Sequence, residues 1–420
     1  MKIGAFCIVC MIVVAGCSPE KEMKSGLKTG TWRGVIVIQG HDLPFGLEIV
    51  TDSGGGYDAY IINASERLLL DEVSVHNDSV DIGLHIFDAN IRAKIDGNKL
   101  EGLFIKNYEQ DYKLPFRAVH GETFRFEPVA GGKAVPDFGG KYAVTFLHEN
   151  DTTPAVALFT QSGDSVTGTF LTPTGDYRYL QGNVVDDTLK LSTFDGNHAY
   201  LFTATKRNDG TLEGEYLSGK TWQEMWIGVK NENATLPDAA TLTYLKPGYD
   251  RIAFTFPDVK GKKISLDDDA YKNKVVILQL FGTWCPNCMD ETRFLAPWYE
   301  TNKERGVAII GLAYERKDDF NYASTRVKKM IDKLDVGYDF VIAGTNDKEK
   351  ASQTLPMLNA VMAFPTTIFI GKDGKVKEIH TGFSGPGTGI YYEQFVQHFN
   401  ETVNELLSEN PASGNAGRSK

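Results

Sequence analysis

The pattern of apolar and polar positions divides the chain into two regions. From residue 27 to about residue 240, short runs with alternating apolar and polar residues recur between turns rich in Gly, Asp and Asn, as in GVIVIQG, DAYIINA and TLKLSTF. Alternation with a period of two places one face of a strand in a core and the other face in solvent. This region is therefore predicted to be antiparallel β structure.

The predicted β region contains an internal repeat. Segments 71–105 and 181–217 share a valine-containing strand, an acidic turn, an apolar strand that ends in Phe-Asp, and a hairpin that ends in Leu-Glu-Gly. Self-similarity over a segment of this length indicates two related structural units. We expect a duplicated pair of antiparallel barrels or sandwiches, with the first unit in residues 29–133 and the second in residues 134–240.

After residue 246 the periodicity changes. The run KVVILQLF (274–281) is continuously apolar, as in a strand that is buried on both faces, and PNCMDETRFLAPWYE (286–300) has apolar residues at helical spacing. Further buried strands and amphipathic helices follow along the chain. We predict an α/β domain over residues 246–408 and a disordered tail over residues 409–420.

The first seventeen residues predict export. Met1 and Lys2 provide a short positive segment, and the apolar run from Ile3 to Val14 is too short to span a bilayer as a helix. The following VVAGC resembles the bacterial lipobox, in which the cysteine, here Cys17, is acylated and becomes the new N-terminus. An ordinary signal peptide or an uncleaved anchor is the alternative. We expect a cell-envelope lipoprotein that faces the periplasm, with residues 18–28 as a polar tether between the membrane and the folded part.

The charge of the chain argues against a polyanionic partner. The formal net charge is -11 at pH 7, and no stretch of the sequence clusters Lys and Arg. Phosphate backbones are bound by such clusters. We therefore expect no role in nucleic-acid binding.

The five cysteines are distributed in a way that leaves one close pair. Cys7 and Cys10 would be removed with the signal peptide, and Cys17 would carry the lipid. The mature protein then retains Cys285 and Cys288, three residues apart. Exported proteins with structural disulfides usually carry several spaced pairs, so a single close pair indicates another use.

The surroundings of this pair favour redox chemistry. A zinc site would need further ligands at matching spacing, and haem attachment would need a histidine where Met289 stands. At the predicted N-terminus of a helix, the macrodipole stabilises a thiolate at Cys285, and Pro286 suits the first helical position. We expect Cys285 to be the nucleophile and Cys288 the resolving thiol of a redox-active disulfide that needs no metal and no other cofactor. A purely structural disulfide is the alternative.

At this point the sequence resembles a known family. WCPNC (284–288) after a buried strand, with AFPTTIFIGKDGKV (363–376) further on, is similar to the thioredoxin fold and, more narrowly, to the membrane-anchored TlpA/ResA-like thiol-disulfide oxidoreductases. The preceding β region resembles stretches upstream of thioredoxin modules in Bacteroidetes-type lipoproteins. The resemblance implies a mixed sheet flanked by helices. It also implies reduction of disulfides in exported proteins and an upstream electron donor in the membrane.

The same resemblance assigns further site residues. Pro365 is implied to follow a cis peptide bond and to face the disulfide, while the backbone of Phe364 pairs with the substrate and Trp284 lies beside it. Gln279 stands where thioredoxin has a buried aspartate, and TlpA/ResA-like proteins carry a glutamate at the position of Glu291. Positions 285, 288 and 291 share one side of a helix. We expect Glu291 to be the proton carrier, with an exposed surface carboxylate as the alternative.

Two other functions are compatible with the sequence. The protein could be an envelope lipoprotein in which the β region binds a ligand or partner, or a thiol peroxidase on the same fold. A peroxidase is disfavoured because no proline stands at the required distance before the first cysteine. In the β region, Tyr177, Tyr179 and His198 could line a binding surface, but we interpret them as ordinary strand residues.

Overall fold

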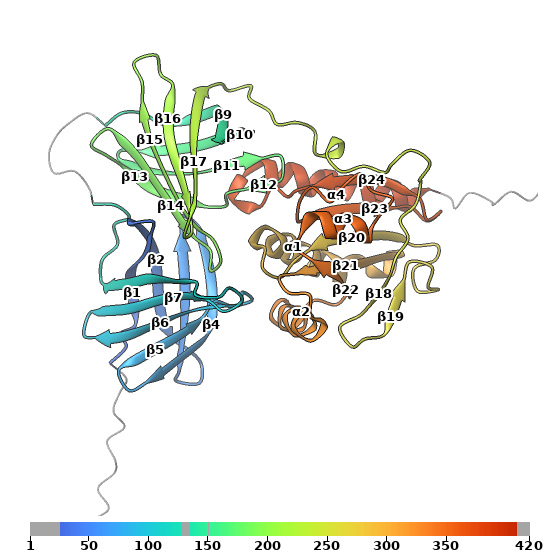
Figure 1. Ribbon diagram of the computed structural model, residues 1–420, viewed down its shortest axis with the longest axis horizontal. Helices are drawn as coiled ribbons and strands as arrows, with labels where there is room; N and C mark the ends of the chain where they lie inside the picture. Colours follow the sequence, from blue (N-terminus) through green and yellow to red (C-terminus); the bar gives the residue numbers. More distant parts are fainter. Residues whose placement is uncertain (1–25, 128–134, 150, 410–420) are drawn as a thin grey trace, which may run out of the picture.

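The computed structural model describes residues 26–127, 135–149 and 151–409. Two all-β units lie on one side of the molecule and an α/β unit lies on the other (Figure 1). Cys17, most of the predicted tether and most of the predicted tail lie outside the described residues. Within those residues, no helix combines the length and the apolar character needed to cross a bilayer.

The first β unit is a closed antiparallel barrel in which each strand pairs with the next and the last strand pairs with the first. Its interior is filled by large apolar side chains such as Trp32, Phe45 and Phe104, which are almost fully buried. The strands are β1 (Gly30–Ile38), β2 (His41–Thr51), β3 (Tyr57–Asn63), β4 (Glu66–His76), β5 (Ser79–Gly83), β6 (Ala89–Asp96), β7 (Lys99–Lys106) and β8 (Lys113–His120).

The second β unit also closes on itself, because β10 pairs with both β9 and β11. The short β12 extends the sheet beyond β11 toward the α/β unit. Aromatic residues such as Phe146, Phe170 and Trp226 fill the interior. The strands are β9 (Gly140–His148), β10 (Asp151–Ser162), β11 (Ser165–Thr172), β12 (Gly175–Asp176), β13 (Leu180–Val185), β14 (Thr188–Phe194), β15 (Ala199–Lys206), β16 (Leu212–Ser218) and β17 (Trp222–Lys230).

The repeated Leu-Glu-Gly falls at the same place in both barrels. Gly102 in β7 and Gly214 in β16 each oppose the preceding strand, β6 and β15 respectively. A Cβ atom at Gly102 would lie 2.0 Å from the carbonyl oxygen of Arg92, and one at Gly214 would lie 2.2 Å from that of Thr203. Both positions therefore require glycine, and this close approach of strands explains why the repeat is visible in the sequence. The expected antiparallel all-β region is confirmed.

The α/β unit contains a five-stranded mixed sheet in the order β22-β21-β20-β23-β24. The first three of these strands run parallel to one another, β23 pairs antiparallel with β20, and β24 pairs antiparallel with β23. The strands are β20 (Val275–Phe281), β21 (Val307–Glu315), β22 (Asp339–Thr345), β23 (Thr366–Ile370) and β24 (Val376–Thr381), preceded by a hairpin of β18 (Thr255–Pro257) and β19 (Lys263–Ser265). The predicted thioredoxin-like arrangement of a mixed sheet with helices is confirmed.

Four α-helices accompany the sheet, and α1 packs against α4 through Phe294, Trp298 and Phe399. Every residue of β20 is buried, as its continuous apolar run predicts. The helices are α1 (Pro286–Asn302), α2 (Phe320–Leu334), α3 (Lys348–Thr354) and α4 (Ile390–Ser408), with short 3₁₀ turns η1 (Ala239–Thr241), η2 (Lys303–Arg305) and η3 (Pro386–Thr388).

Both barrels contact the α/β unit. On the first barrel, β4 faces α2, where Lys329 pairs with Glu72 at 2.8 Å and Lys333 pairs with Asp71 at 2.6 Å. The second barrel contacts the start of α1 through the loops around β12 and before β15. The β units are thus placed next to the segment that carries the cysteine pair.

Candidate active site

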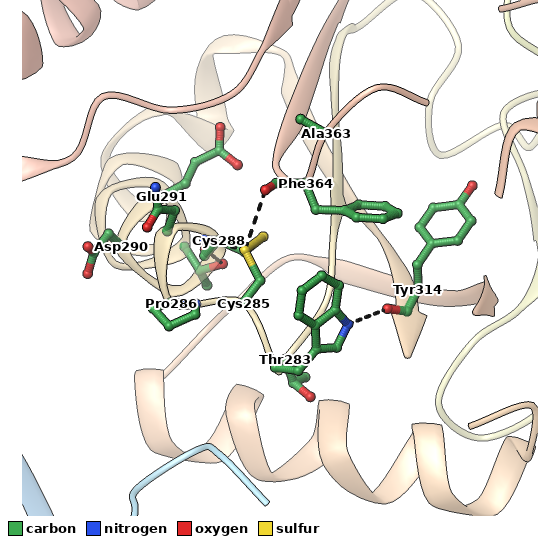
Figure 2. The surroundings of a disulfide bond; sticks show 12 residues. Thr283, Cys285, Pro286, Cys288, Asp290, Glu291, Tyr314, Ala363 and Phe364 are labelled. Carbon is green, nitrogen blue, oxygen red and sulfur yellow. Dashed lines mark hydrogen bonds between the residues drawn. A yellow bond between two sulfur atoms is a disulfide. The ribbon is translucent and has the colours of Figure 1, made fainter. Parts of the chain in front are cut away.

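Cys285 and Cys288 form a disulfide at the N-terminus of α1 (Figure 2). Cys285 is the N-cap of the helix, and its Sγ accepts a hydrogen bond of 3.2 Å from the backbone N–H of Cys288. Cys285 is the more accessible of the two cysteines, because it retains 6% exposure whereas Cys288 has none. In the part of the chain that the structure describes, no group of three or more His, Cys, Asp and Glu residues is arranged to hold a metal ion.

The other residues implied by the family resemblance surround Cys285. The Phe364–Pro365 peptide bond is cis, and the carbonyl oxygen of Phe364 lies 3.5 Å from the Sγ of Cys285. The indole N–H of Trp284 donates to the carbonyl oxygen of Tyr314 at 2.8 Å, and the indole meets the ring of Phe364 edge-on. Figure 2 shows this wall of aromatic rings beside the disulfide. The structure therefore places the backbone of Phe364 at the sulfur of Cys285, with the ring of Trp284 against the ring of Phe364.

Glu291 points into the interior, one turn beyond Cys288 on α1. It has no exposed surface, so its interpretation as a surface carboxylate is wrong. Burial raises the pKa of Glu291 to about 7, although hydrogen bonds from the hydroxyl of Thr367 and the amide of Gln279 act in the opposite direction. A carboxyl group with this pKa can accept and return a proton near neutral pH.

Gln279 on β20 orients this carboxyl group. Its amide nitrogen donates to Glu291 at 2.8 Å and lies 3.1 Å from the hydroxyl oxygen of Thr292. The hydroxyl of Thr292 in turn donates to the carbonyl oxygen of Cys288 at 2.9 Å. The amide at position 279 therefore acts as a donor to the buried carboxylate and links it to the helical turn that carries the second cysteine.

A second buried carboxylate, Glu315 at the end of β21, was not expected from the sequence. Burial raises its pKa, while hydrogen bonds from Thr283 lower it: the backbone N–H donates at 2.8 Å and the hydroxyl donates at 2.9 Å. These bonds fix the turn between β20 and α1, which carries Trp284 and Cys285. A sequence signal existed, because Glu315 directly ends the apolar run VAIIGLAY.

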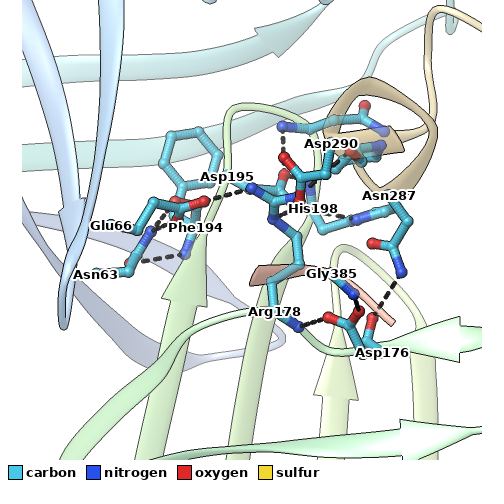
Figure 3. Close-up of polar contacts among 12 residues, drawn as sticks. Asn63, Glu66, Asp176, Arg178, Phe194, Asp195, His198, Asn287, Asp290 and Gly385 are labelled. Atoms are coloured by element: carbon cyan, nitrogen blue, oxygen red, sulfur yellow. Dashed lines mark hydrogen bonds and ion pairs between the residues drawn. The ribbon is translucent and has the colours of Figure 1, made fainter. Parts of the chain in front are cut away.

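Arg178 of the second barrel was also missed. Its side chain has only 3% exposure, and its guanidinium pairs with Asp290 on α1 and with Glu66 on the first barrel, while its Nε lies 3.7 Å from Asp195 (Figure 3). Burial alone would lower the pKa of Arg178, but the surrounding carboxylates, with Asp290 and Glu66 as the largest contributors, outweigh it and raise the pKa. The guanidinium of Arg178 therefore links the two barrels to α1. Its partner on α1, Asp290, is only two residues after Cys288.

Two asparagines add to this junction at the start of α1. Asn197, in the loop before β15, donates to the carbonyl oxygen of Trp284 at 2.7 Å. Asn287, between the two cysteines, donates to the carbonyl oxygen of Asp176 at 3.1 Å (Figure 3). The carboxylate of Asp176 accepts from the backbone N–H of Gly385 at 2.7 Å. The second barrel is therefore hydrogen-bonded to the loop, the helix and the turn that frame the disulfide.

The interpretation of Tyr177, Tyr179 and His198 as strand residues is wrong. All three lie in loops, the first two between β12 and β13 and the third just before β15. Tyr177 and His198 line a cavity of about 240 Å³ together with Trp284 and Cys285. For Tyr177 and His198, the alternative that they face a binding surface agrees better with the structure.

Comparison with known proteins identifies relatives of the α/β unit. The AhpC/TSA family model matches residues 247–379. Thiol-disulfide oxidoreductase ResA from Bacillus thuringiensis subsp. konkukian is 33% identical over 123 residues, which are 29% of this chain and 62% of that protein. ResA from Halalkalibacterium halodurans is 28% identical over 160 residues, 38% of this chain and 77% of that protein.

The chain thus spans less than two thirds of the length of the first of these relatives. A solved thiol:disulfide interchange protein of the thioredoxin family from Chlorobium tepidum is 20% identical and covers 38% of this chain and 96% of its own, with a TM-score of 0.29. The C-terminal region of the chain, from residue 247 to residue 379, is an AhpC/TSA-family domain with a thioredoxin fold and is homologous to the ResA thiol-disulfide oxidoreductases.

Proposed function

We propose that the protein is a thiol-disulfide oxidoreductase that reduces disulfides in exported proteins with the dithiol form of Cys285 and Cys288. The observation that carries this proposal is the position of the pair: Cys285 caps α1 and keeps a small exposed surface, whereas Cys288 is fully buried behind it. The relatives named thiol-disulfide oxidoreductase support it. The redox-active disulfide itself is the only cofactor that the reaction requires.

In the first step, the thiolate of Cys285 attacks one sulfur of the substrate disulfide. A bond forms between Cys285 and that sulfur, the substrate S–S bond breaks, and the departing substrate thiolate takes up a proton. The helix N-terminus and the N–H of Cys288 favour the anionic sulfur before the attack. In a bound substrate, the backbone next to the reacting cysteine would lie along Phe364 and Pro365, with Trp284 as a side wall.

In the second step, Cys288 resolves the mixed disulfide. Glu291 accepts the proton of the Cys288 thiol, and the resulting thiolate attacks the sulfur of Cys285. The protein disulfide forms, and the second substrate thiolate leaves and is protonated. A fully buried thiol needs such an acceptor because water does not reach it, and the raised pKa of Glu291 suits this exchange.

One cycle transfers two electrons from the protein dithiol to the substrate disulfide. The oxidised pair must then be reduced by a second dithiol, which we assign to an upstream electron donor in the membrane. Attachment to the same membrane through an acylated Cys17 would keep the two proteins together. The proposal of lipidation rests on the apolar run before VVAGC.

Replacement of Cys17 by alanine is expected to release the protein from the membrane. Without the cysteine, no acyl chain can be attached, and acyl chains act as anchors by burying methylene groups in the bilayer. Fractionation of cells that express the wild type and the variant measures this directly. A Cys17→Ala protein that stays in the membrane fraction after a high-salt wash would contradict the proposal.

Replacement of Glu291 by glutamine is expected to slow resolution of the mixed disulfide by about 10²-fold near neutral pH, the usual effect of losing a general base. In the wild type, the rate should rise as the carboxylate ionises around pH 7. In Glu291→Gln the rise should move to the ionisation of the thiol itself, at about pH 8.5 or above. Insulin reduction and single-turnover decay of the mixed disulfide are the measurements.

Glu300→Gln on the exposed side of the same helix is the matched control, and its pH profile should follow the wild type. If Glu291→Gln also follows the wild type, Glu291 is not the proton acceptor. If wild-type protein fails to accelerate insulin reduction over the dithiol reductant alone, the proposed function itself is contradicted.

A further inference from the structure

A cavity lies between the second barrel and the α/β unit, directly at the reactive cysteine. Its volume is about 240 Å³, and Cys285, Trp284, Asn287 and Phe364 form one wall. The other wall comes from the barrel and its loops. Six of the lining residues carry aromatic or imidazole rings: Tyr177, His198, Tyr200, Tyr216, Trp284 and Phe364.

The barrel wall of the cavity is a connected set of rings. The imidazole of His198 stacks on Tyr200 with centroids 4.8 Å apart, and Tyr200 and Tyr177 meet Tyr216 edge-on at 5.6 Å and 5.1 Å. The Nδ1 atom of His198 lies 3.1 Å from a carboxylate oxygen of Asp195, which fixes the orientation of the imidazole. The His198 side chain keeps 27% exposure, so its free face is available to a ligand.

The two walls are held at a defined separation. Arg178 pairs with Asp290 and donates to the carbonyl oxygen of Pro286 at 3.3 Å, and Asn197 holds the carbonyl of Trp284. These contacts are buried or partly buried, so opening the cavity would separate Arg178 from Asp290 and break up a buried ion network. A substrate must therefore reach Cys285 while the barrel stays in place.

We propose that this cavity is a substrate subsite that receives an aromatic side chain next to the reacting cysteine, presented on a narrow and flexible polypeptide segment. This inference rests on the proposed function. Aromatic rings pair with other rings in stacked and edge-on geometries, which the His198–Tyr200 stack and Trp284 offer on opposite sides. Disulfides that lie flush on a folded surface are excluded, because the barrel occupies the space such a surface would need.

The size of the cavity agrees with a single side chain. Sites for whole small molecules usually measure about 300–1,000 Å³, and this one is smaller. The lining also contains polar residues, which can form hydrogen bonds with the peptide groups of the segment. The barrel therefore supplies the selectivity for substrate sequence, and the thioredoxin-fold domain supplies the reaction.

The test uses two short peptides with an internal disulfide that differ only in Phe or Ala beside one cysteine, and hydroxyethyl disulfide as a minimal substrate. The intact wild-type protein is expected to reduce the Phe peptide with a kcat/KM about three- to tenfold above that of the Ala peptide, as one aromatic contact allows. His198→Ala removes the partly exposed ring on the barrel side of the cavity. Thr174→Trp fills the cavity from an exposed turn on its rim. Both variants should bring the ratio close to one.

The matched controls are His41→Ala and Thr51→Trp at exposed positions of the first barrel, and both should keep the wild-type ratio. A wild-type ratio near one, or a ratio that neither cavity variant changes, overturns the subsite. If hydroxyethyl disulfide is reduced in that case, the proposed function survives the loss of the subsite. If the wild type reduces none of the three substrates, the proposed function fails as well.

Discussion

Serine in place of Cys285 is expected to lower the rate of insulin disulfide reduction by at least about 10³-fold, because the variant has no nucleophile that a substrate can reach. Cys288 cannot take over the attack, since it has no exposed surface and lies behind Cys285. The measurement is insulin reduction under a dithiol reductant, with the rate of the reductant alone subtracted.

The substitution does not alter the buried carboxyl group of Glu291. Cys285→Ser should therefore fold and retain the thermal midpoint of the reduced wild type. A Cys285→Ser protein with more than a few per cent of wild-type activity would show that Cys288 or another group attacks the substrate. The assignment of Cys285 as the nucleophile would then be wrong.

Methionine in place of Arg178 is expected to destabilise the protein by about 3–5 kcal/mol, the usual result of removing one member of a buried ion network. The guanidinium has 3% exposed surface and neutralises Asp290 and Glu66, which belong to different structural units. Methionine fills a similar volume but leaves these carboxylates buried without their cation. Urea unfolding, followed by circular dichroism, measures the change.

Arg92→Met is the control, because Arg92 pairs with Asp81 at 2.8 Å on the surface of the first barrel with 66% of its side chain exposed. Surface pairs of this kind contribute less than about 1 kcal/mol. An equal decrease in the free energy of unfolding for the two variants would mean that Arg178 does not link the barrels to α1 through a buried ion network.

The sequence predicted most of the α/β unit because its signals are local. A continuous apolar run such as VVILQLF, rich in β-branched residues, favours a strand buried on both faces, and α1 begins where Pro286 follows a capping cysteine. The family resemblance implied the role of Glu291, and the helical register placed it on the same side of α1 as the two cysteines. The repeat in the β region could be recognised because Gly102 and Gly214 meet the same steric limit in both barrels.

The junction between the units could not be predicted, because its partners are far apart in sequence. Glu66 and Arg178 are separated by 112 residues, and Asn197 and Trp284 by 87. Nothing in the local pattern around Arg178 distinguishes a buried arginine that links structural units from an exposed arginine in a strand. Burial of that charge depends on three carboxylates that only the folded chain brings together.

The loops that carry Tyr177, Tyr179 and His198 differ from the predicted strands for a local reason. Alternating aromatic residues such as those in DYRYLQG satisfy the pattern of a strand. In the structure, however, the carboxylate of Asp195 accepts from the backbone N–H groups of Asn197 and His198, at 2.9 Å and 2.6 Å, and holds a tight turn. Side-chain acceptors of this kind compete with the β ladder.

The most direct measurement of the central claim is a mass spectrum of the protein after reaction with a peptide disulfide. Reduced Cys288→Ser should carry one peptide, linked to Cys285 through a mixed disulfide that persists until a reductant is added. Reduced Cys285→Ser should carry almost none. Equal adducts on both variants, or an adduct found mainly on Cys288, would contradict a reaction that begins at Cys285.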